Sequence, residues 1–203
     1  MKHINKQVIG ITGGIGTGKS TVSNILREDG FKVIDADKIS KELMKKGNVS
    51  YKKVLNYFGN EILDQSGHID RGTLGSIVFN NSRLLKKLNN LTHPNIFMEI
   101  KKQVRNSNEK IIFVEIPLLF EEYDKIIEAG IEFDKICLVF ADEKTQINRI
   151  MERNNLTKDE AITRIESQMP VSEKKEMSHI VIENTGSKEE LKNKVNSLLE
   201  KLH

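Results

Sequence analysis

The stretch that decides the fold is Gly13-Gly14-Ile15-Gly16-Thr17-Gly18-Lys19-Ser20-Thr21, close to the N-terminus. It fits the pattern G-x-x-x-x-G-K-[ST], in which backbone N–H groups turn inward to form a nest for anions. The apolar residues 8–12 before it are expected to form a short buried strand, and Val22, Ile25 and Leu26 recur at helical spacing after it. A strand that delivers the loop and a helix N-terminus that receives phosphates predict a binding site for a nucleoside triphosphate.

Each residue type in this phosphate-binding loop (P-loop) has an expected task. Lys19 is expected to reach the β- and γ-phosphates and act in catalysis, and the Ser20 hydroxyl is expected to ligate Mg²⁺. Gly30 ends the following helix, where a left-handed residue is favoured. The expected nucleotide-binding residues are Gly14, Ile15, Gly16, Thr17, Gly18, Lys19, Ser20 and Thr21.

Composition limits the classes of protein to which the chain can belong. Its 203 residues can bury a core, and the single cysteine, Cys137, lies in an apolar run typical of packed interior. A formal net charge of +3 with few aromatic residues does not favour nucleic acid as a partner. Residues 1–7 lack the apolar region of a signal peptide, and no apolar run is long enough to span a bilayer. We therefore expect a soluble, cytoplasmic protein that binds no membrane.

The order of apolar segments indicates an α/β fold. Five segments rich in Ile and Val alternate with helical patterns and predict a five-stranded parallel sheet; they are residues 7–12, 32–36, 111–116, 134–140 and 179–183. The connection from the second to the third is far longer than a simple crossover needs. We expect a nucleotide-binding core of residues 1–37 and 109–203 and a helical insertion of residues 38–108.

Local signals divide the insertion into helices. Tyr51, Val54, Leu55 and Phe58 share one helix face that ends at Gly59, and residues 65–68 form a turn. Asp70 is expected to cap a second helix and a third begins near Ser82. Because proline suits the first helical position, Thr92-His93-Pro94 is expected to start a fourth.

A helical hairpin is expected over residues 143–170. A capping box at Thr157-Lys158-Asp159-Glu160 begins its second helix and Pro170 closes it. Arg149 and Arg153 are four residues apart on one helix face, and Arg164 lies on the next helix. They either converge on phosphates or form a solvated face paired with neighbouring glutamates. A further capping box at Ser187 precedes the final helix, whose leucine stripe is expected to be core.

Acidic residues follow two of the expected strands. Asp35 and Asp37 are at i and i+2, on the same side if the extended conformation persists, where either can accept a proton or help to hold Mg²⁺. The alternative is that one of them caps the next helix. Glu115 ends the third strand and is either a metal-associated acid or a solvated strand terminus.

Six blocks in this order resemble the bacterial dephospho-CoA kinase family over nearly the whole chain. They are Thr12–Thr21 with Val33–Asp37, Gly67–Leu74 with Val78-Phe79, Leu88–Ile96, Pro117–Glu121, the hairpin residues Arg149, Arg153, Ala161, Arg164, Gln168 and Met169, and Ile182–Gly186. His179 stands where the last block usually carries an acid. The Asn184-Thr185-Gly186 loop is a candidate contact for adenine.

The resemblance implies a P-loop NTPase three-layer fold with an acceptor-binding insertion and a helical lid. It implies transfer of the γ-phosphoryl of ATP, with Mg²⁺, to the ribose 3′-hydroxyl of dephospho-CoA, giving CoA and ADP. Asp37 would be the base, and the catalytic lid arginine role falls on Arg149. The implied substrate-binding residues are Asp37, Arg71, His93, Leu118 and Arg153.

Other functions remain open at this point. A P-loop kinase for another small metabolite or nucleotide would share the loop and the lid but not the acceptor insertion. A nucleotide-gated binding protein would hold ATP without acceptor-dependent turnover. In either kinase reading the partner is a small molecule, and the protein is expected to be a monomer or a weak homo-oligomer.

Overall fold

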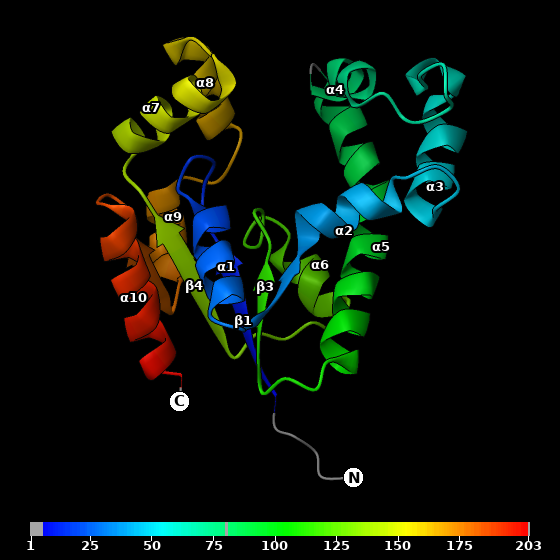
Figure 1. Cartoon of the computed structure of the whole chain (residues 1–203). Coiled ribbons are helices and arrows are strands. Elements are labelled where there is room, and N and C mark those ends of the chain that lie inside the picture. The colour runs from blue at the N-terminus through cyan, green and yellow to red at the C-terminus, as the bar shows by residue number, and fades with distance from the viewer. Residues whose placement is uncertain (1–5, 80, 203) are drawn as a thin grey trace. The chain divides into compact units, whose positions relative to one another are not determined.

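The computed structural model describes residues 6–79 and 81–202, in two compact units (Figure 1). The sheet unit comprises residues 1–34, 107–128 and 132–203, and the helical unit comprises residues 35–106 and 129–131. The expectation that the N-terminus lacks an apolar region falls mainly on residues 1–5, which lie outside the described residues.

The sheet has five strands in the order β2-β3-β1-β4-β5, which confirms the predicted five-stranded α/β architecture. β1 is central and pairs in parallel with β3 and β4, and β4 pairs in parallel with β5. Parallel sheets bury both faces, and β1, β3 and β4 are accordingly almost wholly buried. The strands are Gln7–Thr12 (β1), Lys32–Asp35 (β2), Ile111–Glu115 (β3), Lys135–Phe140 (β4) and Ile180–Glu183 (β5).

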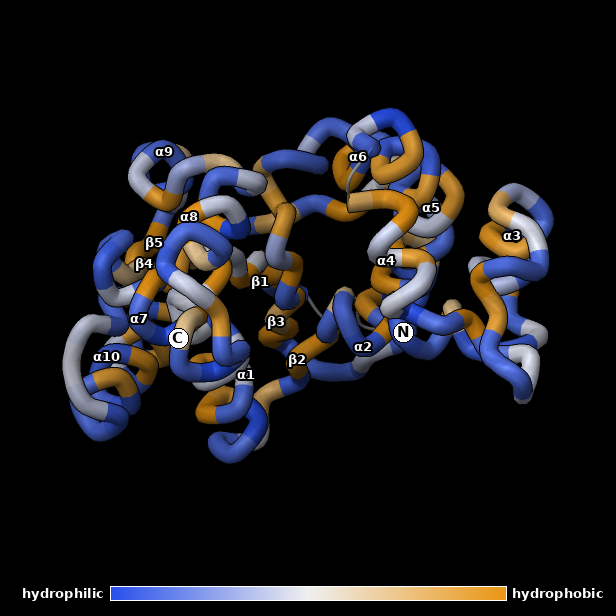
Figure 2. Tube along the Cα trace, turned by 90° about the horizontal axis from the view of Figure 1, so that it is seen from above, coloured by the Kyte–Doolittle hydropathy of each residue, from blue (hydrophilic) through white to orange (hydrophobic). Residues whose placement is uncertain are grey.

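Helices cover both faces of this sheet. α1 (Lys19–Glu28) and α10 (Lys188–Glu200) pack on the face that presents Ile9 and Ile11, where the predicted leucine stripe of α10 enters the core. α9 (Val171–Met177) lies against β4 on the other face. The helices show alternating apolar and polar residues along their length, as expected for elements that bury one side (Figure 2). α6 (Tyr123–Glu128) completes this part of the unit.

The predicted hairpin is formed by α7 (Glu143–Asn154) and α8 (Lys158–Glu166). Thr157 and Glu160 exchange both hydrogen bonds of a capping box, which confirms the predicted helix start. α8 ends at Glu166, earlier than the predicted Pro170, and Pro170 instead precedes the unpredicted short helix α9. The sequence predicts a helix end at Pro170, because proline cannot continue a helix. The fixed φ of proline also suits the start of a helix, which is the position that Pro170 occupies before α9.

In the helical unit the long helix α5 (Ser82–Asn106) contacts each of the other helices. These are α2 (Ala36–Leu43), α3 (Val49–Phe58) and α4 (Arg71–Phe79), with a 3₁₀ turn η1 (Asn60–Ile62) after α3. As predicted, Gly59 ends α3 with φ of 82°, and Asp70 accepts the N–H groups of Gly72 and Thr73 at the start of α4. Hydrogen bonds from Thr73 and Gly72 hold the pKa of the Asp70 carboxyl below its usual value.

The predicted helix start at Thr92-His93-Pro94 is wrong, because α5 runs through Pro94 without a break. Proline removes one N–H, whose partner in a regular helix would be the carbonyl of Asn90. Asn90 is exposed, so water can satisfy that carbonyl. Packing against α2, α3 and α4 then outweighs the local cost, and His93 lies inside a helix rather than at its start. Among the helices described, none has the length and apolar character needed to cross a membrane.

Cys137 provides a direct test of the sheet core. It has no exposed surface, and burial raises the pKa of its thiol to about 12. The thiolate is the reactive species, so its population at pH 8 is lowered about a thousandfold relative to an ordinary thiol. We expect the native protein to resist a thiol reagent and the denatured protein to react at once with one equivalent. Rapid labelling of the native protein would contradict the buried position of β4.

Candidate active site

The P-loop joins β1 to α1 with a backbone that only glycine adopts easily. Gly16 and Gly18 have φ of 79° and 92°. Gly18 is the N-cap of α1, and no side chain among the described residues caps that helix. The positive end of the α1 dipole therefore faces the loop, as a phosphate site requires.

Lys19 folds back over the start of this loop. Its Nζ donates to the carbonyl oxygens of Gly13 at 2.7 Å and Gly14 at 3.1 Å. Ser20 is the second residue of α1 and is exposed. The Lys19 ammonium and the Ser20 hydroxyl thus both come from the first turn of α1, as the motif predicts.

Arg149 reaches the P-loop from α7. Its guanidinium donates to the carbonyl oxygens of Gly16 at 3.3 Å and Asn184 at 3.0 Å. Asn184, which follows β5 and is 7% exposed, donates through Nδ2 to the carbonyl of Thr17 at 2.8 Å. The structure therefore brings together the P-loop, the expected lid arginine and the closing sequence block.

The other two arginines of the hairpin do not join Arg149 and are exposed, which fits the alternative of a solvated helix face. Arg153 is exposed, and its Nε donates to the side chain of Asn154. Arg164 is exposed and adds to the lowering of the pKa of Glu160, which is caused mainly by hydrogen bonds from Thr157. Four residues advance a helix by about 6 Å, so Arg153 lies one turn further along α7, toward the hairpin tip.

The acids after β2 occupy different positions from those expected. The helix α2 begins at Ala36, so Asp35 and Asp37 are not on one side of an extended strand. Asp35 is the N-cap and its Oδ1 accepts the N–H of Lys38 at 3.0 Å. Asp37 is an exposed residue in the first turn of α2. The capping alternative is confirmed for Asp35, which leaves Asp37 as the candidate for chemistry.

Glu115 ends β3 in a buried position and is not the solvated terminus that one alternative predicted. It is 6% exposed, and its Oε2 lies 3.9 Å from a guanidinium nitrogen of Arg27. Across residues 6–79 and 81–202, no group of three or more His, Cys, Asp and Glu side chains has the arrangement of a metal site. Mg²⁺ commonly takes only one or two protein ligands and completes its shell with phosphates and water.

The expected substrate-binding residues lie in both units. Arg71 is the exposed first residue of α4, and His93 is half-buried in α5 with its ring 5.8 Å from that of Phe97. Leu118 is half-buried in the turn after β3, and Arg153 lies on α7. Arg71 and His93 therefore belong to the helical unit, and Leu118 and Arg153 to the sheet unit.

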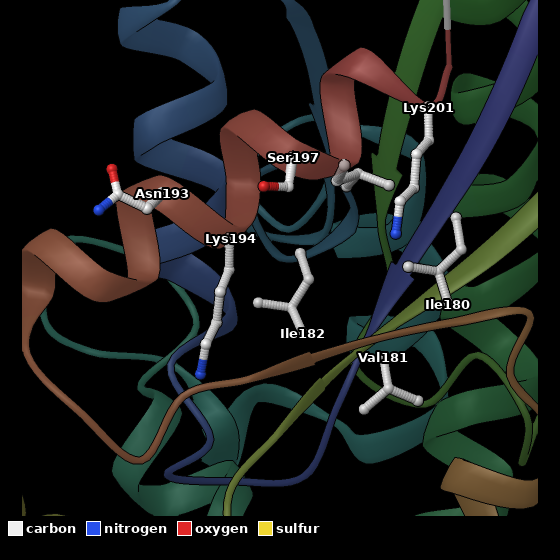
Figure 3. A pocket seen from close by; sticks show the side chains of 8 residues that line it. Ile180, Val181, Ile182, Asn193, Lys194, Ser197 and Lys201 are labelled. Carbon is white, nitrogen blue, oxygen red and sulfur yellow. The ribbon is translucent and has the colours of Figure 1, made fainter.

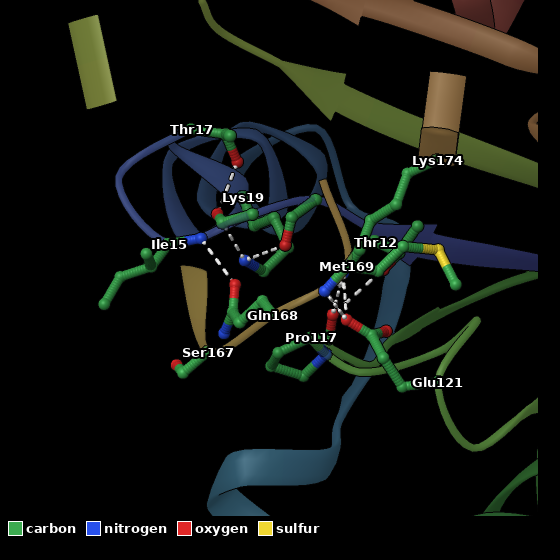
Figure 4. Close-up of polar contacts among 12 residues, drawn as sticks. Thr12, Ile15, Thr17, Lys19, Pro117, Glu121, Ser167, Gln168, Met169 and Lys174 are labelled. Atoms are coloured by element: carbon green, nitrogen blue, oxygen red, sulfur yellow. Dashed lines mark hydrogen bonds and ion pairs between the residues drawn. The ribbon is translucent and has the colours of Figure 1, made fainter. Parts of the chain in front are cut away.

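A P-loop contact missed by the sequence analysis comes from Gln168, between α8 and α9. Its Oε1 accepts the N–H of Ile15 at 2.9 Å (Figure 4). The Ile15 side chain also packs against the apolar cluster of α7 and α8 built on Ile147 and Ile150. The resemblance places Gln168 in the hairpin block without giving it a role, and spacing alone gave no signal for this pairing.

A separate pocket lies between β5 and α10 and is not part of this site. It is lined by Ile180, Val181, Ile182, Asn193, Lys194, Ser197, Leu198 and Lys201 (Figure 3). None of these residues belongs to the P-loop. Lys194 is held at the rim by donating to the carbonyl of Glu183 at 2.7 Å.

Gly18 and Gly30 form a matched pair for testing the loop. Both have positive φ, of 92° and 87°, so alanine at either position costs about 1–2 kcal/mol of backbone strain. A Cβ at Gly18 would overlap Asn184 Nδ2, whereas no described atom lies within 4 Å of a Cβ at Gly30. We expect Gly18→Ala to weaken Mg-ATP binding about tenfold or more in calorimetry and Gly30→Ala to leave it unchanged. Equal affinities in the two variants would show that the Asn184 contact does not shape the loop.

Two known proteins with similar sequences carry the same description. The chain is 43% identical to a dephospho-CoA kinase of Carboxydothermus hydrogenoformans, over 96% of this chain and 93% of the relative. It is 40% identical to a dephospho-CoA kinase of Lactobacillus johnsonii, over 96% and 97% of the two chains.

Solved structures agree in fold. TT1252 from Thermus thermophilus superposes with a TM-score of 0.82 at 31% identity, over 98% of this chain and 99% of that one. Dephospho-CoA kinase from Campylobacter jejuni gives 0.69 at 32% identity, over 97% of both chains. A shikimate kinase from Acinetobacter baumannii, at 13% identity and a TM-score of 0.56 over 97% and 93% of the chains, shares the fold alone.

The family model for dephospho-CoA kinase matches residues 7–190. That span includes the P-loop, Asp37, the helical unit, the α7–α8 hairpin and Asn184. The resemblance seen in the sequence is therefore confirmed: the chain belongs to the dephospho-CoA kinase family.

Proposed function

We propose that this protein transfers the γ-phosphoryl group of ATP to the 3′-hydroxyl of dephospho-CoA and releases CoA and ADP, the last step of coenzyme A synthesis. The observation that carries the proposal is the P-loop in which Lys19 and Arg149 both bind backbone carbonyls. Two cations at one phosphate-binding loop suit a reaction governed by positioning and charge stabilisation. Membership of the dephospho-CoA kinase family supports dephospho-CoA as the acceptor of the phosphoryl group.

The P-loop is the proposed binding site for the phosphates of ATP. The backbone of residues 14–18 and the start of α1, including Thr21, would surround the β- and γ-phosphates. Lys19, positioned by the carbonyls of Gly13 and Gly14, would bind these phosphates, and Arg149 would stabilise charge that develops on the transferred group. The Asn184 loop is the proposed neighbour of the adenine.

Ser20 is the proposed protein ligand for Mg²⁺. Its hydroxyl is a hard oxygen donor, exposed in the first turn of α1 beside the loop, which fits the preference of this cation. Bound magnesium would neutralise part of the charge on the β- and γ-phosphates.

Asp37 is the proposed catalytic base. As the 3′-oxygen of dephospho-CoA attacks the γ-phosphorus, the bond from phosphorus to the β–γ bridging oxygen breaks and ADP leaves. The proton of the attacking hydroxyl passes to the Asp37 carboxylate. The exposed position of Asp37 in the first turn of α2, and the use of Asp35 as helix cap, support this choice.

The helical insertion, residues 38–108, is the proposed acceptor-binding domain, and residues 1–37 with 109–203 the nucleotide-binding core. Arg71, His93, Leu118 and Arg153 are the proposed contacts for dephospho-CoA. The hairpin within residues 143–170 would act as a lid that excludes water from the transferred phosphoryl group. We infer a cytoplasmic enzyme that acts as a monomer or weak homo-oligomer on small molecules.

The activity is tested by measuring ADP release with Mg-ATP in the presence and absence of dephospho-CoA. We expect ADP release to depend on the acceptor and mass spectrometry to show CoA, one phosphoryl group heavier than the acceptor. Omission of Mg²⁺ should abolish turnover. ATP binding without turnover of dephospho-CoA would refute the proposed acceptor and lead to assays with other small metabolites.

Asp37 and Asp35 provide a matched pair for the base. Asp37→Asn removes the proton acceptor and should lower kcat about 10²–10⁴-fold while the affinity for ATP changes little. Asp35→Asn keeps a side-chain oxygen that can cap α2, so it should retain most of the activity. Steady-state kinetics of both variants decide the assignment, and a kcat near the native value for Asp37→Asn would remove Asp37 as the base.

A further inference from the structure

Lys174 in α9 is a lysine with no exposed surface. Its Nζ lies 2.7 Å from Glu121 Oε1 and donates to the carbonyl of Pro117 at 3.3 Å. Removing an ammonium from water is costly unless it is paired and hydrogen-bonded. The next residue, Lys175, makes its ion pair with Glu183 in partly exposed surroundings. Of these two neighbouring lysines, only Lys174 has its charge buried. This difference indicates that Lys174 has a specific structural task.

One partner of Lys174 leads to the start of the P-loop. The carbonyl of Pro117, in the turn after β3, also accepts the hydroxyl of Thr12 at 3.2 Å (Figure 4). Thr12 is fully buried at the end of β1, directly before Gly13. The ammonium of Lys174 and the hydroxyl of Thr12 thus hold the same carbonyl oxygen.

The other partner leads to the P-loop through the return segment of the hairpin, residues 167–170. Glu121 Oε1 accepts the N–H of Met169 at 3.1 Å as well as the ammonium of Lys174. The neighbouring Gln168 accepts the N–H of Ile15. Figure 4 shows these side chains gathered beside the loop. A second chain of contacts therefore runs from Lys174 to Ile15.

Thr12 and Ile15 flank the two residues that hold Lys19. The carbonyls of Gly13 and Gly14 both accept its Nζ. The orientation of these two peptide groups is limited by the residues on either side, because successive peptide planes are linked only through φ and ψ. The two paths from Lys174 consequently fix the part of the loop that positions the ammonium of Lys19.

We propose that Lys174 is a positioning residue for phosphoryl transfer, which acts with Glu121 to hold the turn after β3 and the return segment of the hairpin against the first half of the P-loop. This inference rests on the proposed function. Lys174 does not touch the reacting atoms. Through Pro117 and Gln168 it fixes Gly13 and Gly14, and through them Lys19.

The proposal separates catalysis from ATP binding. Lys174→Met keeps the length of the side chain but removes the charge and the donor. We expect kcat to fall about ten- to a hundredfold, because small displacements of catalytic groups have effects of this size. The KM for ATP should change by less than about threefold, since the helix N-terminus and the second half of the loop are retained. In an amide NMR spectrum the Ile15 resonance should shift.

Lys175→Met is the matched control. It lies next to Lys174 in the same helix and also loses an ion pair to a glutamate, but its contacts are with Glu183 and the ring of Phe140 and not with the groups that hold Thr12 and Ile15. We expect native kcat and an unchanged Ile15 resonance. A shared loss in both lysine variants would show a general effect of destabilising α9 and would overturn the proposal.

Gln168→Leu tests the same path without disturbing the buried ion pair. It removes the acceptor for the Ile15 N–H and should lower kcat with little effect on the melting temperature. If Lys174→Met does not fold, this variant decides: native kcat in Gln168→Leu overturns the proposal. If the native enzyme itself does not turn over dephospho-CoA, the proposed function has failed. The Ile15 resonance then still tests the network, and an unchanged resonance in the variants overturns it.

Discussion

The structure depends on one constraint, the need to satisfy the backbone carbonyls of the P-loop. A loop that turns its N–H groups toward an anion turns carbonyl oxygens toward the protein, and buried carbonyls require donors. Lys19 donates to Gly13 and Gly14, Arg149 to Gly16 and Asn184 to Thr17. These donors come from α1, α7 and the segment after β5, so three separate parts of the sheet unit contact the loop.

The same contacts connect the hairpin to the nucleotide site. Arg149 from α7 donates to the carbonyl of Gly16, Gln168 beyond α8 accepts the N–H of Ile15, and the Ile15 side chain adds an apolar contact to the hairpin cluster. The hairpin is thus attached to the loop through α7 and through the segment that follows α8. A movement of the hairpin would alter the groups that surround a triphosphate, which is how a lid affects transfer as well as access of water.

The fold was largely predictable because its signals are local or periodic. The strands are continuous apolar runs, the capping boxes at Thr157 and Ser187 are short patterns, and Gly59 marks a helix end by its backbone freedom. Predictions failed where packing outweighs a local preference. Pro94 lies inside α5 because α2, α3 and α4 pack on that helix, and Asp35 and Asp37 do not share one side of an extended strand because α2 begins at Ala36.

By itself the sequence determined the parallel sheet, the P-loop and its Lys19 and Ser20, and the resemblance to the dephospho-CoA kinase family, since these are carried by contiguous residues with fixed spacing. Only the tertiary structure placed Arg149, and not Arg153, on a P-loop carbonyl, decided that Asp35 is the acid that caps α2, and revealed the contact of Gln168 and the buried pair of Lys174 and Glu121. The partners in that pair are separated by 53 positions along the chain, from Glu121 to Lys174. No spacing rule links such residues, because their contact depends on how β1, β3 and α9 pack together.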